Sequence, residues 1–268
     1  MKRMSKYLVL VKASIKETLE YRLSLYVTLF GNIIYLIITY YLWTAIFASA
    51  DKAEINGMTL SSTIIYVVLG ATIGNCLEVY VVWDIGRNIQ SGQIILDLLK
   101  PMKYRQFMLN QVTGKVIGKF LTNFIPVYIV TFFLIKDYLV VGPNVLFFII
   151  SFAIGALINY YLNFIIGTIC IYTESIWGIN IMKTVVISLL SGMTIPISFF
   201  PPALKRVVEF LPFQSICNVP LTILLDRDNE IKQYLIYIGI QLIWALALML
   251  FTEFLWNKSI KKITVNGG

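Results

Sequence analysis

The sequence has no histidine and few charged residues. None of its 268 residues is histidine, and Asp, Glu, Lys and Arg together make up 13%. Histidine is the commonest metal ligand and a frequent general base, so zinc-hydrolase, haem and Ser-His-Asp chemistry are not expected. A soluble domain is about one-quarter charged. This chain therefore has too little polar surface for a soluble globule of its size.

Cysteine is also scarce. The three cysteines, Cys76, Cys170 and Cys217, give neither an even number nor a metal-ligand spacing. No disulfide framework or metal centre is predicted, and no cofactor is expected on this chain.

What the sequence does contain is long apolar runs, since 58% of its residues are hydrophobic. A helix that crosses a membrane needs about 20 mostly apolar residues, and the runs lack the period-two alternation of barrel strands. We therefore predict an all-α integral membrane protein forming one transmembrane domain over residues 1–268. Six spans are expected, at residues 23–47, 60–83, 120–135, 145–172, 176–200 and 234–256, the third having the shortest apolar core.

The distribution of basic residues predicts the orientation. If residues 1–22, 84–119, 173–183 and 257–268 share one side of the membrane, that side carries 16 of the 22 Lys and Arg residues. Basic residues are enriched in cytoplasmic loops. Both termini are therefore expected in the cytoplasm of a cell-membrane protein, and the net charge of +8 indicates topology rather than nucleic-acid binding.

Three segments outside the spans have distinctive patterns. Residues 1–22 have an amphipathic stretch, which predicts a helix in the cytoplasmic membrane interface. In the loop 84–119, Gly86 and Gly92 are expected to break the helix, and Pro101 is expected to end the short segment that begins after Gly92. This segment between Gly92 and Pro101 is unstable alone, so it should dock beneath its own bundle or in the groove of a partner.

The third segment, between spans five and six, is apolar but rich in proline. Five of the eight prolines lie between Gly192 and Pro220, and proline interrupts helices. Within the predicted extracytoplasmic region 196–233 we expect a broken helical segment that re-enters the outer leaflet, with an ordinary external loop as the alternative.

Polar residues within the spans suggest a site. Glu78 is an acid inside span two, where a charge is costly and usually faces a bundle interior or an aqueous path. Asn75 lies one turn earlier, and Asn159 and Asn163 lie on one face of span four. The four residues could line a substrate path. The asparagines could equally form hydrogen bonds between helices at a subunit interface.

The pattern as a whole resembles the membrane subunits of the type-two ATP-binding-cassette (ABC) exporter superfamily. The residues that carry the resemblance are Ser-Gly-Gln-Ile-Ile-Leu-Asp-Leu-Leu-Lys-Pro at 91–101 and Ser-Gly-Met-Thr-Ile-Pro at 191–196, followed by Phe-Pro-Pro at 200–202 and Leu-Pro at 211–212. Within the superfamily, the chain is most similar to the bacterial viologen-exporter-like permeases.

The resemblance implies a permease without catalysis of its own, which works as a dimer with an identical or related permease and moves its substrate outward. A separate pair of ATPase subunits would bind ATP and Mg²⁺. Consistent with this, the closest approach to a phosphate-binding loop, residues 114–120, has the wrong spacing. The coupling helix to the ATPase would comprise Gln93, Ile94, Ile95, Asp97, Leu98 and Lys100. A stand-alone ion-coupled carrier and an assembly or sensor subunit are the alternatives.

Overall fold

The computed structural model describes residues 2–20, 22–134, 142–173, 176–226, 228 and 230–262. The predicted end of span three at residue 135, and the ends of the chain at residues 1 and 263–268, lie outside this part. So do Lys136 and Arg227, two of the basic residues assigned to the outer side.

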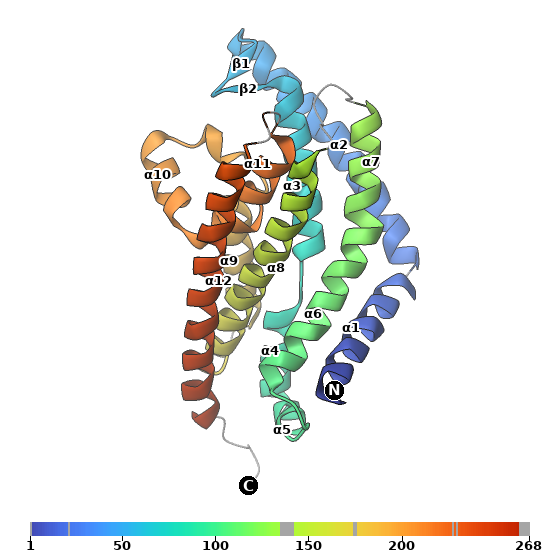
Figure 1. Cartoon of the computed structure of the whole chain (residues 1–268), viewed down its shortest axis with the longest axis vertical. Helices are drawn as coiled ribbons and strands as arrows, with labels where there is room; N and C mark the ends of the chain where they lie inside the picture. Colours follow the sequence, from blue (N-terminus) through green and yellow to red (C-terminus); the bar gives the residue numbers. More distant parts are fainter. Residues whose placement is uncertain are drawn as a thin grey trace.

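The described chain is a bundle of helices that run along one long axis (Figure 1). α5 lies at the same end of the bundle as the start of α1 and the end of α12, and the only described strands lie at the other end. The helices and strands are α1 (Lys2–Glu20), α2 (Arg22–Ala50), β1 (Glu54–Ile55), β2 (Met58–Thr59), α3 (Leu60–Leu77), α4 (Val81–Gln90), α5 (Gln93–Leu98), α6 (Tyr104–Lys119), the π-helix η1 (Phe120–Phe124), α7 (Ile125–Leu134), α8 (Pro143–Ile169), α9 (Ile176–Leu190), the 3₁₀ turn η2 (Ile197–Phe199), α10 (Pro202–Phe210), the 3₁₀ turn η3 (Pro212–Ile216), α11 (Asn218–Leu225), α12 (Ile231–Ser259) and the 3₁₀ turn η4 (Ile260–Lys262).

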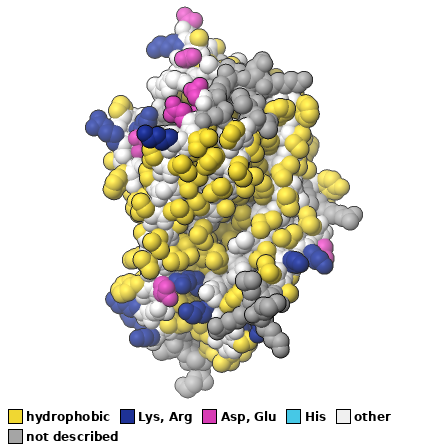
Figure 2. Space-filling view, viewed as in Figure 1, with side chains coloured by type: hydrophobic (Ala, Val, Ile, Leu, Met, Phe, Trp, Pro, Cys, Tyr) yellow, Lys and Arg dark blue, Asp and Glu magenta, His cyan; other side chains and the backbone are white. Residues whose placement is uncertain are grey.

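Five helical stretches in the described chain are long and apolar enough to cross a membrane. They are Tyr26–Ala50, Leu60–Gln90, Tyr104–Leu134, Pro143–Ile169 and Ile231–Lys262. Their outward faces carry exposed large apolar side chains such as Phe30 and Ile243. Figure 2 shows these side chains as a broad band between two ends where the charged side chains gather. This surface suits lipid, and the chain is a multi-pass membrane protein of the predicted all-α class.

The fifth expected span is shorter than predicted. α9 has 15 residues, about 22 Å at 1.5 Å per residue, against a hydrocarbon core of about 30 Å. The chain leaves the helix at Ser191 and Gly192, where Gly192 has φ +79°. A left-handed residue ends a helix, and glycine adopts this conformation without strain. The predicted span extended to residue 200 because the segment beyond the turn is also apolar, and hydropathy does not detect the turn.

The third expected span is longer than predicted. It forms one continuous stretch from Tyr104 to Leu134, so residues 104–119 are helix rather than loop. One face of α6 packs against α1. The N-terminal helix is present as α1, and it runs parallel to α6: the Tyr7 hydroxyl donates to Gln106 Oε1 at 2.7 Å near one end, and Gly118 faces Thr18 near the other.

The contact between α1 and α6 requires glycine. A Cβ atom on Gly114 would lie 2.5 Å from the backbone oxygen of Val11, and one on Gly118 would lie 2.8 Å from Cβ of Thr18. Because the nearest atom at Gly114 is backbone, the two helices would have to separate to admit a side chain.

We therefore expect Gly114→Ala to lower the free energy of unfolding by about 1–3 kcal/mol, the usual cost of overpacking. Thermal unfolding of the purified protein in detergent measures the effect. Gly239→Ala on α12 is the matched control, because no atom lies within 4 Å of the added Cβ. Equal stability of the two variants would mean that α1 does not pack closely on α6 in the folded protein.

The proline-rich segment is broken, as predicted, and its second half is buried. In η3 and α11, Ile216, Cys217 and Leu221 have no exposed surface. Side chains from the bundle satisfy the irregular backbone: Gln241 Nε2 donates to the Ser215 oxygen at 2.8 Å, and Asn144 Nδ2 donates to the Leu224 oxygen at 2.9 Å. Irregular backbone that is buried needs such partners for its carbonyl oxygens.

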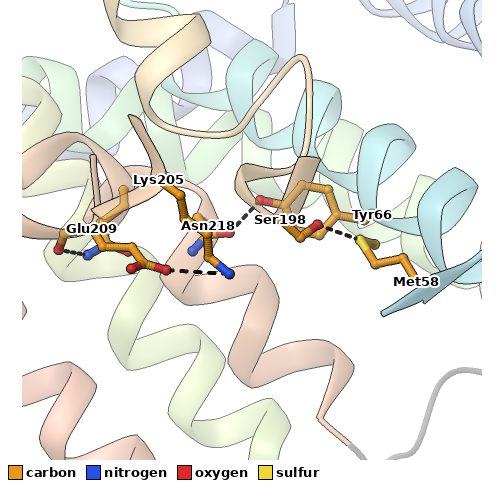
Figure 3. A network of polar contacts seen from close by, with 7 residues as sticks. Met58, Tyr66, Ser198, Lys205, Glu209 and Asn218 are labelled. Carbon is orange, nitrogen blue, oxygen red and sulfur yellow. Dashed lines mark hydrogen bonds and ion pairs between the residues drawn. The ribbon is translucent and has the colours of Figure 1, made fainter. Parts of the chain in front are cut away.

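Two hydrogen bonds connect this segment to β2 and α3 (Figure 3). The Tyr66 hydroxyl donates to Asn218 Oδ1 at 2.8 Å, and the Ser198 hydroxyl lies 3.1 Å from Met58 Sδ. α10 lies outside the packed part, where Lys205 and Glu209 form an ion pair along its polar face. Val207 and Phe210 on the same helix are exposed. The segment thus combines a buried half with an amphipathic helix on the surface.

A two-stranded hairpin precedes α3 and is the one described element outside the predicted all-α fold. Glu54 pairs with Thr59 and Ile55 with Met58. Asn56 and Gly57 form the turn with φ +52° and +79°. Asn-Gly is the preferred pair for this tight hairpin turn.

Candidate functional site

The second membrane stretch is interrupted in its middle. α3 ends at Leu77, and Glu78 has an extended backbone (φ −67°, ψ 105°) before α4 begins at Val81. A continuous span was predicted over residues 60–83, so the break at 78–80 is a correction. Ending a helix within a bundle leaves carbonyl oxygens of its last turn without intrahelical partners.

Two side chains from other helices satisfy these carbonyls. Lys119 Nζ, at the end of α6, donates to the backbone oxygens of Asn75 at 3.1 Å and Glu78 at 2.8 Å. Asn159 Nδ2 on α8 donates to the Leu77 oxygen at 2.9 Å. A cation at a helix C-terminus also interacts favourably with the helix dipole. The break is therefore stabilised by residues 41 and 82 positions away in the chain.

A chain of amides connects the same region to α2 and η1. Asn75 Nδ2 donates to Asn32 Oδ1 at 3.1 Å, and Asn32 Nδ2 donates to Asn123 Oδ1 at 2.6 Å. Asn123 lies in the π-helix, where the Ile125 amide reaches back five residues to the Phe120 oxygen. Pro126 follows, and the wider turn before it avoids the clash of a proline ring with a preceding carbonyl.

A cavity of about 660 Å³ lies beside the break, between α2, α3, α8 and α9. It extends from Trp83 on α4 to Met193 and Thr194 beyond α9. The four residues predicted as a substrate path, Asn75, Glu78, Asn159 and Asn163, all line it. Asn75 and Asn159 also hydrogen-bond between helices, so the two interpretations of the asparagines are compatible.

The cavity holds one acid and one base. Glu78 is exposed to it, and among the described residues no hydrogen bond or ion pair reaches its carboxylate. Lys183 on α9 also lines the cavity and donates to Asn163 Oδ1 at 2.9 Å. Sequence reasoning assigned Lys183 to the cytoplasmic side near the start of a span, and so missed it as a site residue. Its position within an apolar run, like that of Glu78, was the available signal.

The predicted coupling segment forms α5, a helix of six residues at the end of the bundle (Figure 1). Gly92 precedes it with φ +72°, so this glycine breaks the chain as predicted. Gly86 does not, because α4 runs through it. Glycine is needed there for packing, since a Cβ atom would lie 2.7 Å from Cδ1 of Ile176.

One face of α5 is fixed to the bundle. Ile94 is fully buried. Asp97 is also buried, and its carboxylate accepts from Asn88 Nδ2 at 2.8 Å and from Lys100 Nζ at 2.7 Å. The Lys100 ammonium additionally lies 4.3 Å from the centre of the Phe107 ring. Ile94 and Asp97 therefore hold α5 against the bundle.

The other face of α5 is apolar and exposed. Leu96 is 57% exposed, Leu99 is 76% exposed and Leu98 is 37% exposed. Gln93 is exposed as well, and Ile95 is half-buried. Leu96 and Leu99 were not among the predicted coupling residues. Because they are the most exposed apolar groups on this segment, they are better candidates for contact with a partner than Ile94 and Asp97.

A multi-pass helical bundle with a charged cavity and an exposed apolar helix at one end has the features of a membrane transport component. The comparisons agree with this class. The family model of ABC-2 family transporter proteins matches residues 33–267, and the chain belongs to that family. It is thus a permease-type membrane component of an ABC transporter, in a family whose members generally have no catalytic activity. The search of curated proteins finds no match.

Proposed function

We propose that this chain is the permease subunit of an ATP-driven ABC exporter, coupled through α5 to a separate ATPase subunit. Membership of the ABC-2 family supports the transporter role. The observation that carries the coupling assignment is the geometry of α5, which is fixed to α4 by Asp97 while Leu96 and Leu99 face outward.

The connection from α5 to the cavity supports the mechanism. α5 is attached to α4, and α4 begins directly after the break at Glu78, which lines the cavity. A displacement of α5 by an ATPase would move α4 as a lever about the break. Helices that move as rigid elements about a few end residues are a common form of conformational change. In this way nucleotide-driven motion reaches the residues proposed to contact the substrate.

Several finer assignments belong to the same proposal. The bundle would comprise six spans, with α9 as the fifth, and η3 with α11 would form the segment that re-enters the outer leaflet. Both termini and α5 would face the cytoplasm, and transport would be outward across the cell membrane, as in the viologen-exporter-like branch. A second permease, identical or related, would complete the pathway, because one small bundle scarcely surrounds a drug-sized solute.

Purification of the intact assembly tests the proposal. The tagged chain, extracted from native membranes in mild detergent, is expected to retain a nucleotide-binding subunit and to hydrolyse ATP. Mass spectrometry identifies the retained chains, and a vanadate-sensitive ATPase assay measures the activity. A chain that purifies alone and moves solute on an ion gradient without ATP would contradict it.

The stand-alone carrier is the second candidate, because Glu78 and Lys183 give the cavity an acid and a base. Ion-coupled carriers use such intramembrane pairs. Transport assays with ATP and with a proton gradient, each supplied separately, distinguish the two.

A further inference from the structure

The charges of the cavity limit what it can bind, and this inference rests on the proposed transport function. Glu78 and Lys183 both line it, yet no ion pair within 4.0 Å joins them among the described residues. A charge in a largely apolar setting is costly unless it is paired. The two groups therefore share the cavity without a direct contact, and the Lys119 ammonium, which binds the Glu78 backbone oxygen, is a second cation near the carboxylate.

Both groups can still accept a ligand. An ammonium has three donors, and Lys183 uses one for Asn163. Glu78 has both carboxylate oxygens available, because Lys119 binds its backbone oxygen rather than its side chain. The cavity thus offers one acceptor site for a cation and one donor site for an anion.

The remaining lining suits a flat apolar body. Tyr35, Tyr80 and Trp83 contribute aromatic surface, and Gly31 leaves open space on α2. The volume of about 660 Å³ lies within the range of small-molecule sites. Aromatic side chains in general stabilise a cation through the faces of their rings, and the Arg87 guanidinium already lies 5.8 Å from the centre of the Trp83 ring.

We propose that this cavity binds zwitterionic solutes with an aromatic or flat apolar body, the cationic group on Glu78 and the anionic group on Lys183. A pure cation leaves Lys183 repelling it, and a pure anion leaves Glu78 repelling it. Only a ligand that carries both charges satisfies the two groups together. The repulsion of a pure cation by Lys183, or of a pure anion by Glu78, contributes to specificity as much as the attraction of the zwitterion does.

Three fluorescent probes of similar shape test the charge requirement. They are tetramethylrhodamine, a zwitterion; its methyl ester, a cation of the same body; and carboxyfluorescein, an anion. Each is titrated against the purified full assembly without nucleotide, and anisotropy reports binding, with empty micelles as the blank. The zwitterion is expected to bind about tenfold more tightly than the ester, the effect of one additional charged contact.

Two variants assign the charges to their residues. Lys183→Met should remove the preference for the zwitterion over the ester. Glu78→Gln should weaken both by about tenfold and favour carboxyfluorescein. Lys232→Met is the control, because Lys232 is exposed and is not in the cavity lining, and it should change nothing.

The proposal is overturned if zwitterion and ester bind equally to the unmodified protein, if no probe binds saturably, or if the preference survives in Lys183→Met. Should a variant fail to fold, the comparison of the three probes on the unmodified protein still decides. The titration uses no nucleotide, so its failure leaves the ATPase result intact. Loss of the ATPase association would instead overturn the proposed function.

Discussion

Replacing Leu99 by aspartate is expected to uncouple this chain from its ATPase while leaving the bundle folded. Leu99 is 76% exposed at the end of α5 and follows directly after the helix. In the proposed assembly it enters an apolar cleft of the ATPase, where a carboxylate would be desolvated without a partner. Loss of a hot-spot residue at an interface costs about 2 kcal/mol or more, so if Leu99 is the apolar anchor of this contact, binding should weaken by about 30-fold or more.

Co-purification and ATP-driven transport measure the result. Ala53→Asp is the matched control, because it adds the same charge at an exposed position in the turn before β1, at the opposite end of the bundle. The control should retain the ATPase. If Leu99→Asp retains it as well, α5 is not the contact.

Lys119→Met is expected to give the second large effect, a loss of folding stability. Methionine has no donors, so the backbone oxygens of Asn75 and Glu78 lose the ammonium that binds them. Hydrogen bonds to charged groups contribute about 1.5–3 kcal/mol each, and unsatisfied backbone within a membrane costs several kcal/mol. We expect the free energy of unfolding to fall by about 3 kcal/mol, with the melting temperature lower by roughly 5–10 °C.

Lys115→Met provides the control, one turn earlier on the same helix. Its Nζ is 4.0 Å from a Glu17 oxygen, and both side chains are substantially exposed. Such surface pairs contribute less than about 1 kcal/mol. Thermal unfolding in detergent should therefore separate the two variants clearly. If they melt together, the ammonium of Lys119 does not stabilise the break between α3 and α4.

The sequence predicted best those features that depend on neighbouring residues. Hydropathy located the apolar helices, and Gly92 marked the start of α5 because its left-handed backbone is a local property. The isolated charge at Glu78 indicated an internal site without any partner being known. Each of these signals can be recognised in the sequence without knowledge of the tertiary structure.

The features that the sequence could not predict depend on distant partners. Lys119 and Asn159 bind carbonyl oxygens at the break at residues 78–80, and α1 packs along the helix at residues 104–119. The resemblance assigned Asp97 to the contact with the ATPase, yet Asn88 and Lys100 hold its carboxylate inward. Sequence spacing on so short a helix does not decide which face is buried.

The labelling of a cysteine placed at position 96 tests the central claim most directly. Leu96 is 57% exposed, whereas Cys76, Cys170 and Cys217 are buried, so a membrane-impermeant thiol reagent should react mainly with the new residue. In inverted membrane vesicles we expect Leu96→Cys to react, and to be protected when the ATPase subunit is bound. In sealed, intact cells it should not react. Labelling from outside intact cells, or labelling that the ATPase does not slow, would contradict coupling through α5.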